Sequence, residues 1–172
     1  VKVTNSWYDP KGEEEAAKTL LNMNCDVIAQ HCDTVYPQTL AQEKGVYSIG
    51  YNSDMSKEAP EACLCSVIWN WSAYYTSAVQ SVIDGTWDGS NYYGGMNENL
   101  VSITPVADFA VDTTQEKVNV AKQQILSGKN GVFDGVIETN TGATVGTAGK
   151  TLDDSVITGG INWYFKTVSV IE

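Results

Sequence analysis

The chain has 172 residues, of which 42% are hydrophobic and 18% are charged, and its formal net charge is −11. This length suffices for one α/β domain with a sizeable core, and no apolar run approaches the roughly 20 residues that span a bilayer. All 10 basic residues are Lys, so the chain lacks the guanidinium fork that binds phosphate through two donors. We therefore expect no nucleic-acid partner.

Strand and helix patterns alternate over the first two thirds of the chain. Strands are predicted over residues 1–6, 26–30, 46–50 and 63–69. A helix is predicted from Pro10 to Met23, capped by Asp9, and a second runs through Leu40 and stops at Gly45. Such alternation predicts right-handed crossovers and a three-layer α/β domain, with a parallel sheet covered by helices on both faces.

A further helix, a loop and a change of pattern follow. The helix is capped by Ser72 and ends at Gly85, and a loop rich in Gly and Asn covers residues 86–99. A strand over residues 100–104 and a helix from Thr114 to Gly128 come next. Strands are then predicted over residues 132–139 and 164–171, with a Gly/Thr-rich turn over residues 141–149. Residues 129–172 are therefore expected to form a peripheral, β-rich tail.

Two groups of side chains could be functional, but a structural role explains each of them more simply. Glu13, Glu14 and Glu15 lie in the first turn of a predicted helix, where negative charge offsets the helix dipole, and we expect them to be solvated. The cysteines at positions 25, 32, 63 and 65 could be buried free thiols, two disulfides or, with His31, a zinc site. We favour free thiols, because the domain is large enough to fold without disulfides and no C-x2-C pair is present.

The residues of an enzyme active site are not evident. With one His and no G-x-S-x-G stretch, a Ser-His-Asp triad has no basis, and no strand is followed by G-x-G-x-x-G. Residues 146–151 end like a phosphate-binding loop, but Thr144 stands where such a loop needs its first glycine, so we interpret them as part of a turn. We expect no catalysis, no cofactor and no metal.

Aromatic and polar side chains gather where the predicted strands end. Ligands of an open parallel sheet bind outside the carboxyl ends of its strands. The candidate ligand-binding residues at these ends are Trp7, Tyr8, Gln30, His31, Asp33, Thr34, Asn52, Asp54 and Trp69. Such a set suits a flat polar ligand that stacks on indole and meets amide and carboxylate groups. The alternative for each Trp is a place in the core or in an interface between lobes.

Six stretches of sequence together resemble one protein family. They are NSWYDP (5–10), DVIAQHCDT (26–34), KGVYSIGYNSDM (44–55), SVIWNW (66–71), DGTW (84–87) and YGGM (93–96). In this order they closely resemble the basic membrane protein family, the lipoprotein substrate-binding components of ABC transporters, which include purine nucleoside receptors. The resemblance covers nearly the whole chain.

The resemblance implies a type I periplasmic-binding-protein fold with two lobes. Residues 1–172 would form the carboxy-terminal lobe, with residues 72–104 normally associated with the first lobe. The chain opens on an apolar stretch without a signal peptide, so we expect it to be cut from a longer protein. The missing amino-terminal lobe is therefore an expected partner.

The resemblance also implies a function. We expect an extracellular solute-binding component of an ABC importer, which binds a purine nucleobase or nucleoside in an interlobe cleft and meets an ABC permease in the membrane. The parent protein would be lipid-anchored at the extracellular face of the cell membrane through its amino terminus. The alternatives are a ligand-sensing module for a signalling partner and a Rossmann-like enzyme acting on sugars or nucleotides.

Two positions depart from the nucleoside-binding pattern. In nucleoside-binding relatives an aromatic residue at the position of Trp7 stacks on the base, an Asp at the position of Asn52 holds the ribose, and a Lys at the position of Trp69 assists. Asn52 has lost the charge that makes hydroxyl recognition strong, and Trp69 replaces a cation by a stacking surface. A free nucleobase is therefore as good a candidate as a nucleoside.

Overall fold

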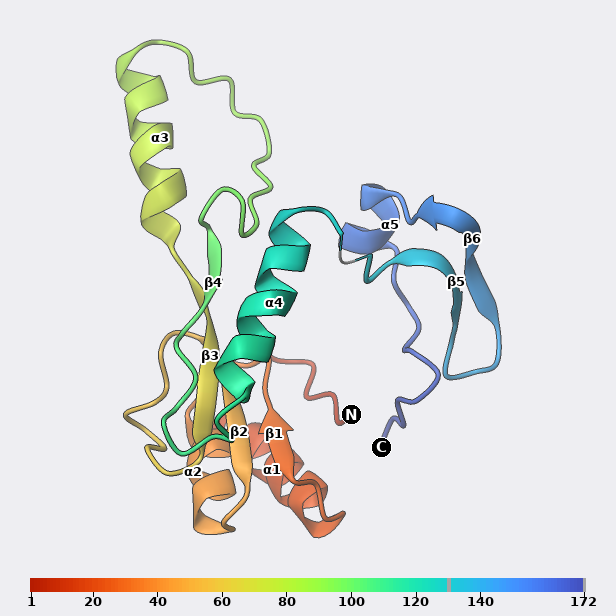
Figure 1. The fold of residues 1–172 in the computed structure, drawn as a ribbon. Helices are drawn as coiled ribbons and strands as arrows, with labels where there is room; N and C mark the ends of the chain where they lie inside the picture. Colours follow the sequence, from red (N-terminus) through yellow and green to blue (C-terminus); the bar gives the residue numbers. More distant parts are fainter. Residues whose placement is uncertain (130, 172) are drawn as a thin grey trace. The chain divides into compact units, whose positions relative to one another are not determined.

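The computed structural model describes residues 1–129 and 131–171, which fall into two compact units (Figure 1). The larger unit comprises residues 4–119, and the smaller one joins residues 1–3 to residues 120–172. The boundary between the units falls within a single helix, α4 (Thr114–Leu126). Of the helices that the structure describes, none is both long and apolar enough to cross a membrane.

A four-stranded sheet organises the larger unit. Its strands lie in the order β1 (Val27–Ala29), β2 (Tyr47–Asn52), β3 (Cys63–Trp69) and β4 (Val101–Ile103). β1, β2 and β3 are mutually parallel, whereas β4 pairs antiparallel with β3. The predicted α/β class is confirmed, and the parallel arrangement holds for the three strands linked by short helical or turn crossovers. An antiparallel edge strand is common on such sheets, and an apolar strand pattern carries no information about direction.

Two helices cover β1 and β2. α1 (Pro10–Asn22) begins as predicted, because Asp9 caps it by accepting a 3.0 Å hydrogen bond from the backbone N–H of Gly12. α2 (Tyr36–Glu43) packs against α1, and both helices pack against the sheet. Ala17 and Ala41 are 2% and 0% exposed. Small side chains at these positions allow the helices to approach closely.

A second part of the core lies where the turn between β2 and β3 folds back on the sheet. Met55, Ala59, Ala62 and Cys63 form one buried cluster there. Ser66 of β3 is fully buried beside this cluster, and its hydroxyl accepts a 3.0 Å hydrogen bond from the backbone N–H of Met55. The turn is thereby fixed to the sheet just beyond the end of β2.

α3 (Trp71–Ile83) extends away from the end of β3 in Figure 1, and none of its residues is buried. Its exposed large apolar side chains are Trp71, Tyr75, Val79, Val82 and Ile83. The predicted cap by Ser72 was wrong: Asn70 occupies the N-cap position, and the Ser72 hydroxyl donates a 2.6 Å hydrogen bond to Asn70 Oδ1. The Ser72 hydroxyl therefore bonds to the Asn70 side chain and does not cap the free backbone N–H groups of the helix.

The smaller unit contains a hairpin and a short helix. β5 (Asp134–Glu138) pairs antiparallel with β6 (Thr144–Thr151), and α5 (Asp154–Gly159) follows. The prediction of a turn over residues 141–149 was wrong beyond residue 143, because β6 continues through Gly146 and Gly149. Both glycines have positive φ, +83° and +75°, so they are strand irregularities that only Gly adopts easily. Residues 146–151 therefore belong to a strand.

Two predicted strands are reduced to isolated bridges. Residues 1–6 and 164–171 form no strand; within them only Lys2 bridges Ile171, and Phe165 bridges Thr139. A segment with an alternating apolar pattern forms a strand only if a neighbouring strand edge is free to pair along its length. Residues 1–6 find such an edge at one position, Lys2, and residues 164–171 find one at two positions, Phe165 and Ile171.

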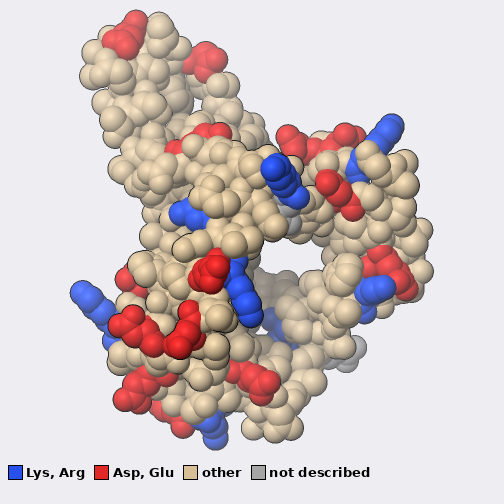
Figure 2. Space-filling model, in the orientation of Figure 1, with Lys and Arg blue, Asp and Glu red and all other residues tan. Residues whose placement is uncertain are grey.

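Acidic side chains dominate the charged surface in the view of Figure 2. The lysines on that face are scattered singly among Asp and Glu and do not gather into a basic patch. This distribution agrees with the formal net charge of −11.

The cysteines at positions 25, 32, 63 and 65 are all free thiols in the structure. Within residues 1–129 and 131–171, no group of three or more His, Cys, Asp and Glu could hold a metal ion. Burial raises the pKa of the Cys32 thiol, and the nearby negative charge of Glu13 acts in the same direction. Burial also raises the pKa of Cys65.

Alkylation should therefore report both the number of free thiols and how slowly each thiol reacts in the folded chain. Iodoacetamide added to the unfolded chain without reductant should modify all four cysteines, as counted by mass spectrometry. In the folded chain at pH 8, Cys32 and Cys65 should react slowly, because a raised pKa leaves less thiolate, and their rates should climb as the pH rises. Fewer than four labels before reduction, and four after it, would instead reveal a disulfide.

Candidate functional site

Three segments meet at the carboxyl end of the parallel strands. The backbone N–H of Asp33, after β1, donates a 2.8 Å hydrogen bond to the carbonyl of Trp7, just before α1. The Asn52 side chain, at the end of β2, donates to the Asp33 carboxylate at 3.4 Å. Asp33 thus links the other two segments. We call Trp7, His31, Asp33, Tyr51 and Asn52 the rim.

The rim presents an open aromatic surface. The ring of His31 stands perpendicular to both neighbours, with ring centroids 5.3 Å from Trp7 and 4.4 Å from Tyr51. Trp7 and Tyr51 are nearly parallel, at 6.5 Å and 17°. Trp7 remains 61% exposed, although burying an indole is strongly favourable. An exposed aromatic cluster next to polar groups is typical of a binding surface.

Asn52 adopts an unusual backbone conformation. Its φ is +72°, and the N–H of Ser53 donates a 2.8 Å hydrogen bond to the carbonyl of Tyr51, which makes Asn52 the centre of a three-residue γ-turn. A γ-turn with positive φ is rare and strained, and Asn tolerates such a φ better than most residues. The turn points the Asn52 amide toward Asp33 and ends β2 abruptly. Strain of this kind concentrates at functional sites.

Two of the predicted site residues turn their side chains inward. Thr34 is 6% exposed, and its hydroxyl donates a 2.6 Å hydrogen bond to the Glu13 carboxylate. The Gln30 amide nitrogen donates to the carbonyls of Cys32 and Thr34, at 2.8 and 2.7 Å. Both side chains therefore lie beneath the rim and shape its backbone.

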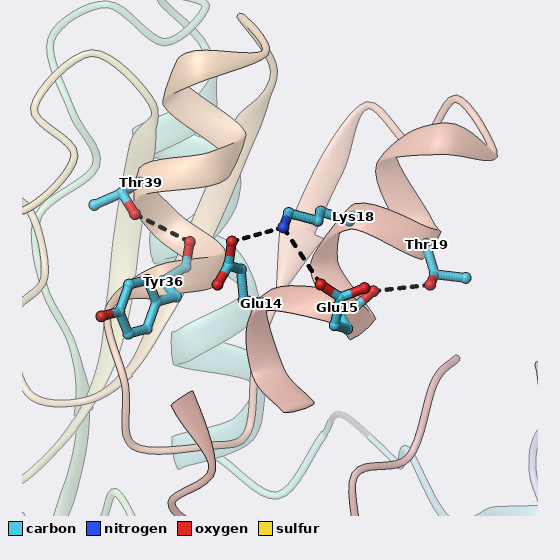
Figure 3. Close-up of polar contacts among 6 residues, drawn as sticks. All are labelled: Glu14, Glu15, Lys18, Thr19, Tyr36 and Thr39. Atoms are coloured by element: carbon cyan, nitrogen blue, oxygen red, sulfur yellow. Dashed lines mark hydrogen bonds and ion pairs between the residues drawn. The ribbon is translucent and has the colours of Figure 1, made fainter. Parts of the chain in front are cut away.

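Glu13 corrects the prediction of a solvated glutamate cluster, because it is 1% exposed. It precedes the buried Ala16 and Ala17 by three and four positions, so the helical period places it on the inner face of α1. This spacing was the sequence signal that could have revealed it. Glu14 and Glu15 behave as expected: both pair with Lys18, at 2.7 and 3.4 Å, on the outer face (Figure 3).

The remaining predicted residues lie at the margins of the rim. Tyr8 is 69% exposed. Asp54 accepts a 3.0 Å hydrogen bond from the N–H of Ser56, which lowers the pKa of its carboxyl. Trp69, on β3 next to β2, stacks on Trp71 at 5.4 Å and 19°. No ring stacking or side-chain hydrogen bond among the described residues joins these three to the rim, whereas Tyr51, absent from the predicted set, is part of it.

Comparison with known proteins gives one family match and several relatives. The sequence model of the family described as "ABC transporter substrate-binding protein PnrA-like" matches residues 1–133. A purine-binding protein of Brucella abortus is 35% identical over 164 residues, which are 95% of this chain and 46% of the relative. A putative ABC transporter glucose-binding protein, TsgA13 of Haloferax volcanii, is 31% identical over 78% of this chain and 34% of its own length.

A solved structure resembles the fold. The crystal structure of a transcriptional activator of the comK gene from Bacillus halodurans superposes with a TM-score of 0.62 at 21% identity. The match covers 70% of this chain and 44% of that one. In all three comparisons, this chain spans less than half of the relative's length.

Proposed function

Because the chain belongs to the PnrA-like family of ABC transporter substrate-binding proteins, we propose that its rim is one wall of a cleft that binds a purine nucleobase or nucleoside. The observation that carries this proposal is the exposed indole of Trp7, held beside His31 and Tyr51. The purine-binding protein of Brucella abortus, 35% identical, supports the choice of ligand class.

The chemistry of the rim suits a flat heterocycle. The open face of Trp7 offers a stacking surface, and stacking on an aromatic side chain stabilises a bound base by about 1 to 3 kcal/mol. The Asp33 carboxylate can accept hydrogen bonds from ring or exocyclic N–H groups of the ligand. The Asn52 amide can both donate and accept. Gln30 and Thr34 enter the proposal as residues that shape the rim, and Tyr8, Asp54 and Trp69 as residues at its margin.

The proposal favours a free base at least as strongly as a nucleoside. A carboxylate would bind ribose hydroxyls through charge-assisted hydrogen bonds, and Asn52 supplies only neutral ones. A sugar alone is the other small ligand to consider, because the relative from Haloferax volcanii is named a putative glucose-binding protein. A sugar would use the same aromatic face but would leave the Asp33 carboxylate to recognise hydroxyls.

The proposal places the chain in a two-lobed, lipid-anchored protein at the extracellular face of the membrane. Residues 1–172 would be its carboxy-terminal lobe, with residues 129–172 as a peripheral tail. The amino-terminal lobe would form the opposite cleft wall and cover residues 72–104, where α3 leaves its apolar side chains exposed. Ligand would close the lobes, and a permease would recognise the closed form. A sensory role is the second candidate; permease and ATPase genes beside the parent gene would decide for transport.

Calorimetric titration of the two-lobed parent protein tests the ligand class. We expect adenine or hypoxanthine to bind at least as tightly as adenosine and guanosine, since the rim stacks a base but offers no charge dedicated to ribose. Glucose is the control ligand and should give no heat. Binding of glucose with no response to the four purines would overturn the proposal. Conversion of a nucleoside by the pure protein would identify an enzyme.

A further inference from the structure

A chain of hydrogen-bonded polar side chains lies directly beneath the rim, and all of its members except the partly exposed Gln30 are buried. Its members are Glu13 of α1, Thr34 and Gln30 of the segment that follows β1, and Gln38 of α2. Glu13 and Gln38 are 1% and 0% exposed. We call these four residues the buried network.

Glu13 is the acceptor end of this network. One carboxylate oxygen accepts hydrogen bonds from the hydroxyl and the backbone N–H of Thr34, at 2.6 and 3.1 Å. The other accepts one from the backbone N–H of Asp9, at 3.1 Å. A single buried carboxylate therefore joins the segment that precedes α1 to the segment that follows β1.

The two glutamines extend the network to β2. The Gln30 side chain is fully engaged, because its nitrogen donates to the carbonyls of Cys32 and Thr34 and its oxygen accepts from Gln38 at 2.7 Å. The Gln38 nitrogen also donates to the carbonyl of Ile49 on β2, at 3.1 Å. Ile49 lies two residues before Tyr51.

The three segments that the network joins are the three that carry the rim. Trp7 lies two residues before Asp9, His31 and Asp33 lie between Gln30 and Thr34, and Tyr51 is on β2. Apolar side chains of similar volume would often stabilise such a core at least as well as buried charge and amides do. Directional hydrogen bonds to backbone groups do what apolar packing does not: they fix where a loop runs.

We propose that Glu13 is a positioning residue, which acts through the buried network to hold Trp7 and the segment of residues 31–33 in the arrangement that binds ligand. Glu13 itself does not touch the ligand, since it is buried beneath the rim. This inference rests on the proposed function for its ligand, but its structural part can be measured without any ligand.

Glu13→Gln is the decisive variant. It keeps the shape of the side chain but replaces one acceptor oxygen by an NH2 group, which is a donor. This group must face the donors of either Thr34 or Asp9, so hydrogen bonds on that side are lost. The matched control is Glu15→Gln, which removes the same charge from the same helix at a side chain that is 64% exposed and whose carboxylate pairs with Lys18 (Figure 3).

Two ligand-free measurements on the 172-residue chain test the network. Amide hydrogen exchange should accelerate about tenfold or more at Asp9 and Thr34 in Glu13→Gln, relative to the Ser48 amide in β2, because hydrogen bonds to a charged acceptor are lost locally. Peptide-resolved alkylation of Cys32 at pH 8 should also become faster, since Glu13 helps to raise the pKa of that thiol. The control variant should change neither.

Adenine titration of the two-lobed parent protein then tests the role in binding. We expect Glu13→Gln to raise the Kd for adenine about tenfold, with Glu15→Gln unchanged. Equal acceleration at Asp9, Thr34 and Ser48 with an unchanged Kd would mean that Glu13 only stabilises the fold, and would overturn the proposal. Unchanged amide exchange at Asp9 and Thr34 in Glu13→Gln would also overturn the proposal.

Two further outcomes keep the test decisive. If Glu13→Gln does not fold, Thr34→Val replaces it, because this variant loses only the 2.6 Å hydroxyl bond and keeps the backbone one. Faster exchange at Asp9 and a raised Kd in Thr34→Val would support the proposal, and wild-type behaviour would reject it. If the wild-type parent binds no purine, the proposed function fails. Faster exchange at Asp9 and Thr34 than at Ser48, measured without ligand, would still support the role of Glu13 in positioning the rim.

Discussion

In the two-lobed parent protein proposed above, replacing Trp7 by alanine should weaken adenine binding by about 1 to 3 kcal/mol, the contribution of one aromatic stacking partner. This corresponds to a Kd roughly 5- to 150-fold higher. The indole is 61% exposed, so its removal leaves no buried cavity and should cost the fold little. Calorimetric titration with adenine measures the affinity, and urea unfolding of the same variant measures the stability.

Two further variants make the Trp7 result specific. Trp7→Phe should retain most of the affinity, because a smaller ring still stacks. Phe109→Ala removes an aromatic ring that is 40% exposed and stacks at 6.0 Å on Tyr47, at the opposite end of β2 from the rim. It should leave adenine binding unchanged. A Trp7→Ala protein that binds adenine like the wild type would remove Trp7 from the site.

Local signals in the sequence predicted most helices and the central strands. Asp9 followed by Pro10 marks the start of α1, and the strand predicted over residues 63–69 coincides with β3. The turn at the end of β2 was also predictable, because polar residues follow an apolar run there. Each of these signals depends on neighbours in the chain, which the sequence displays directly.

Features that depend on distant contacts were missed or misplaced. Gly146 and Gly149 predicted a turn, but Gly146 pairs with Val136 of β5, and Gly149 lies in the irregular part of β6 between the paired Thr147 and Thr151. The segments at residues 1–6 and 164–171 have strand patterns but no extended edge to pair with. No local pattern records which edge is available, so these assignments needed the three-dimensional structure.

The candidate site shows the same division. The sequence placed Trp7, His31, Asp33 and Asn52 at strand ends, and the structure brings these four together. Which side chains face outward was not predictable for residues in a loop, where no fixed period applies. Thr34 turns inward because Glu13 accepts its hydroxyl, and Tyr51 joins the rim because His31 packs against it.

Gly50→Ala should destabilise the chain by about 1 to 3 kcal/mol, the usual cost of an extra methyl group in a well-packed core. A Cβ at Gly50 would lie 2.3 Å from Ser66 Oγ, which is closer than atoms can pack, and 3.0 Å from Met55 Cβ, which is a tight contact. Ser66 cannot move aside freely, because it is fully buried and its hydroxyl holds the backbone N–H of Met55. Urea unfolding, followed by circular dichroism, gives the change in the free energy of unfolding.

The control and a double variant identify the cause. Gly95→Ala should be nearly neutral, because the atom nearest to its Cβ would be Glu98 Oε2 at 3.7 Å. Ser66→Ala removes the hydroxyl that the new methyl group meets, so the loss in the double variant should be smaller than the sum of the two single losses. If the two losses of stability were additive, the Ser66 hydroxyl would not be the group that the new methyl group meets. Gly50 immediately precedes Tyr51 and Asn52, so the strain that crowds Ser66 should also displace the rim, and Gly50→Ala should weaken adenine binding as well as the fold.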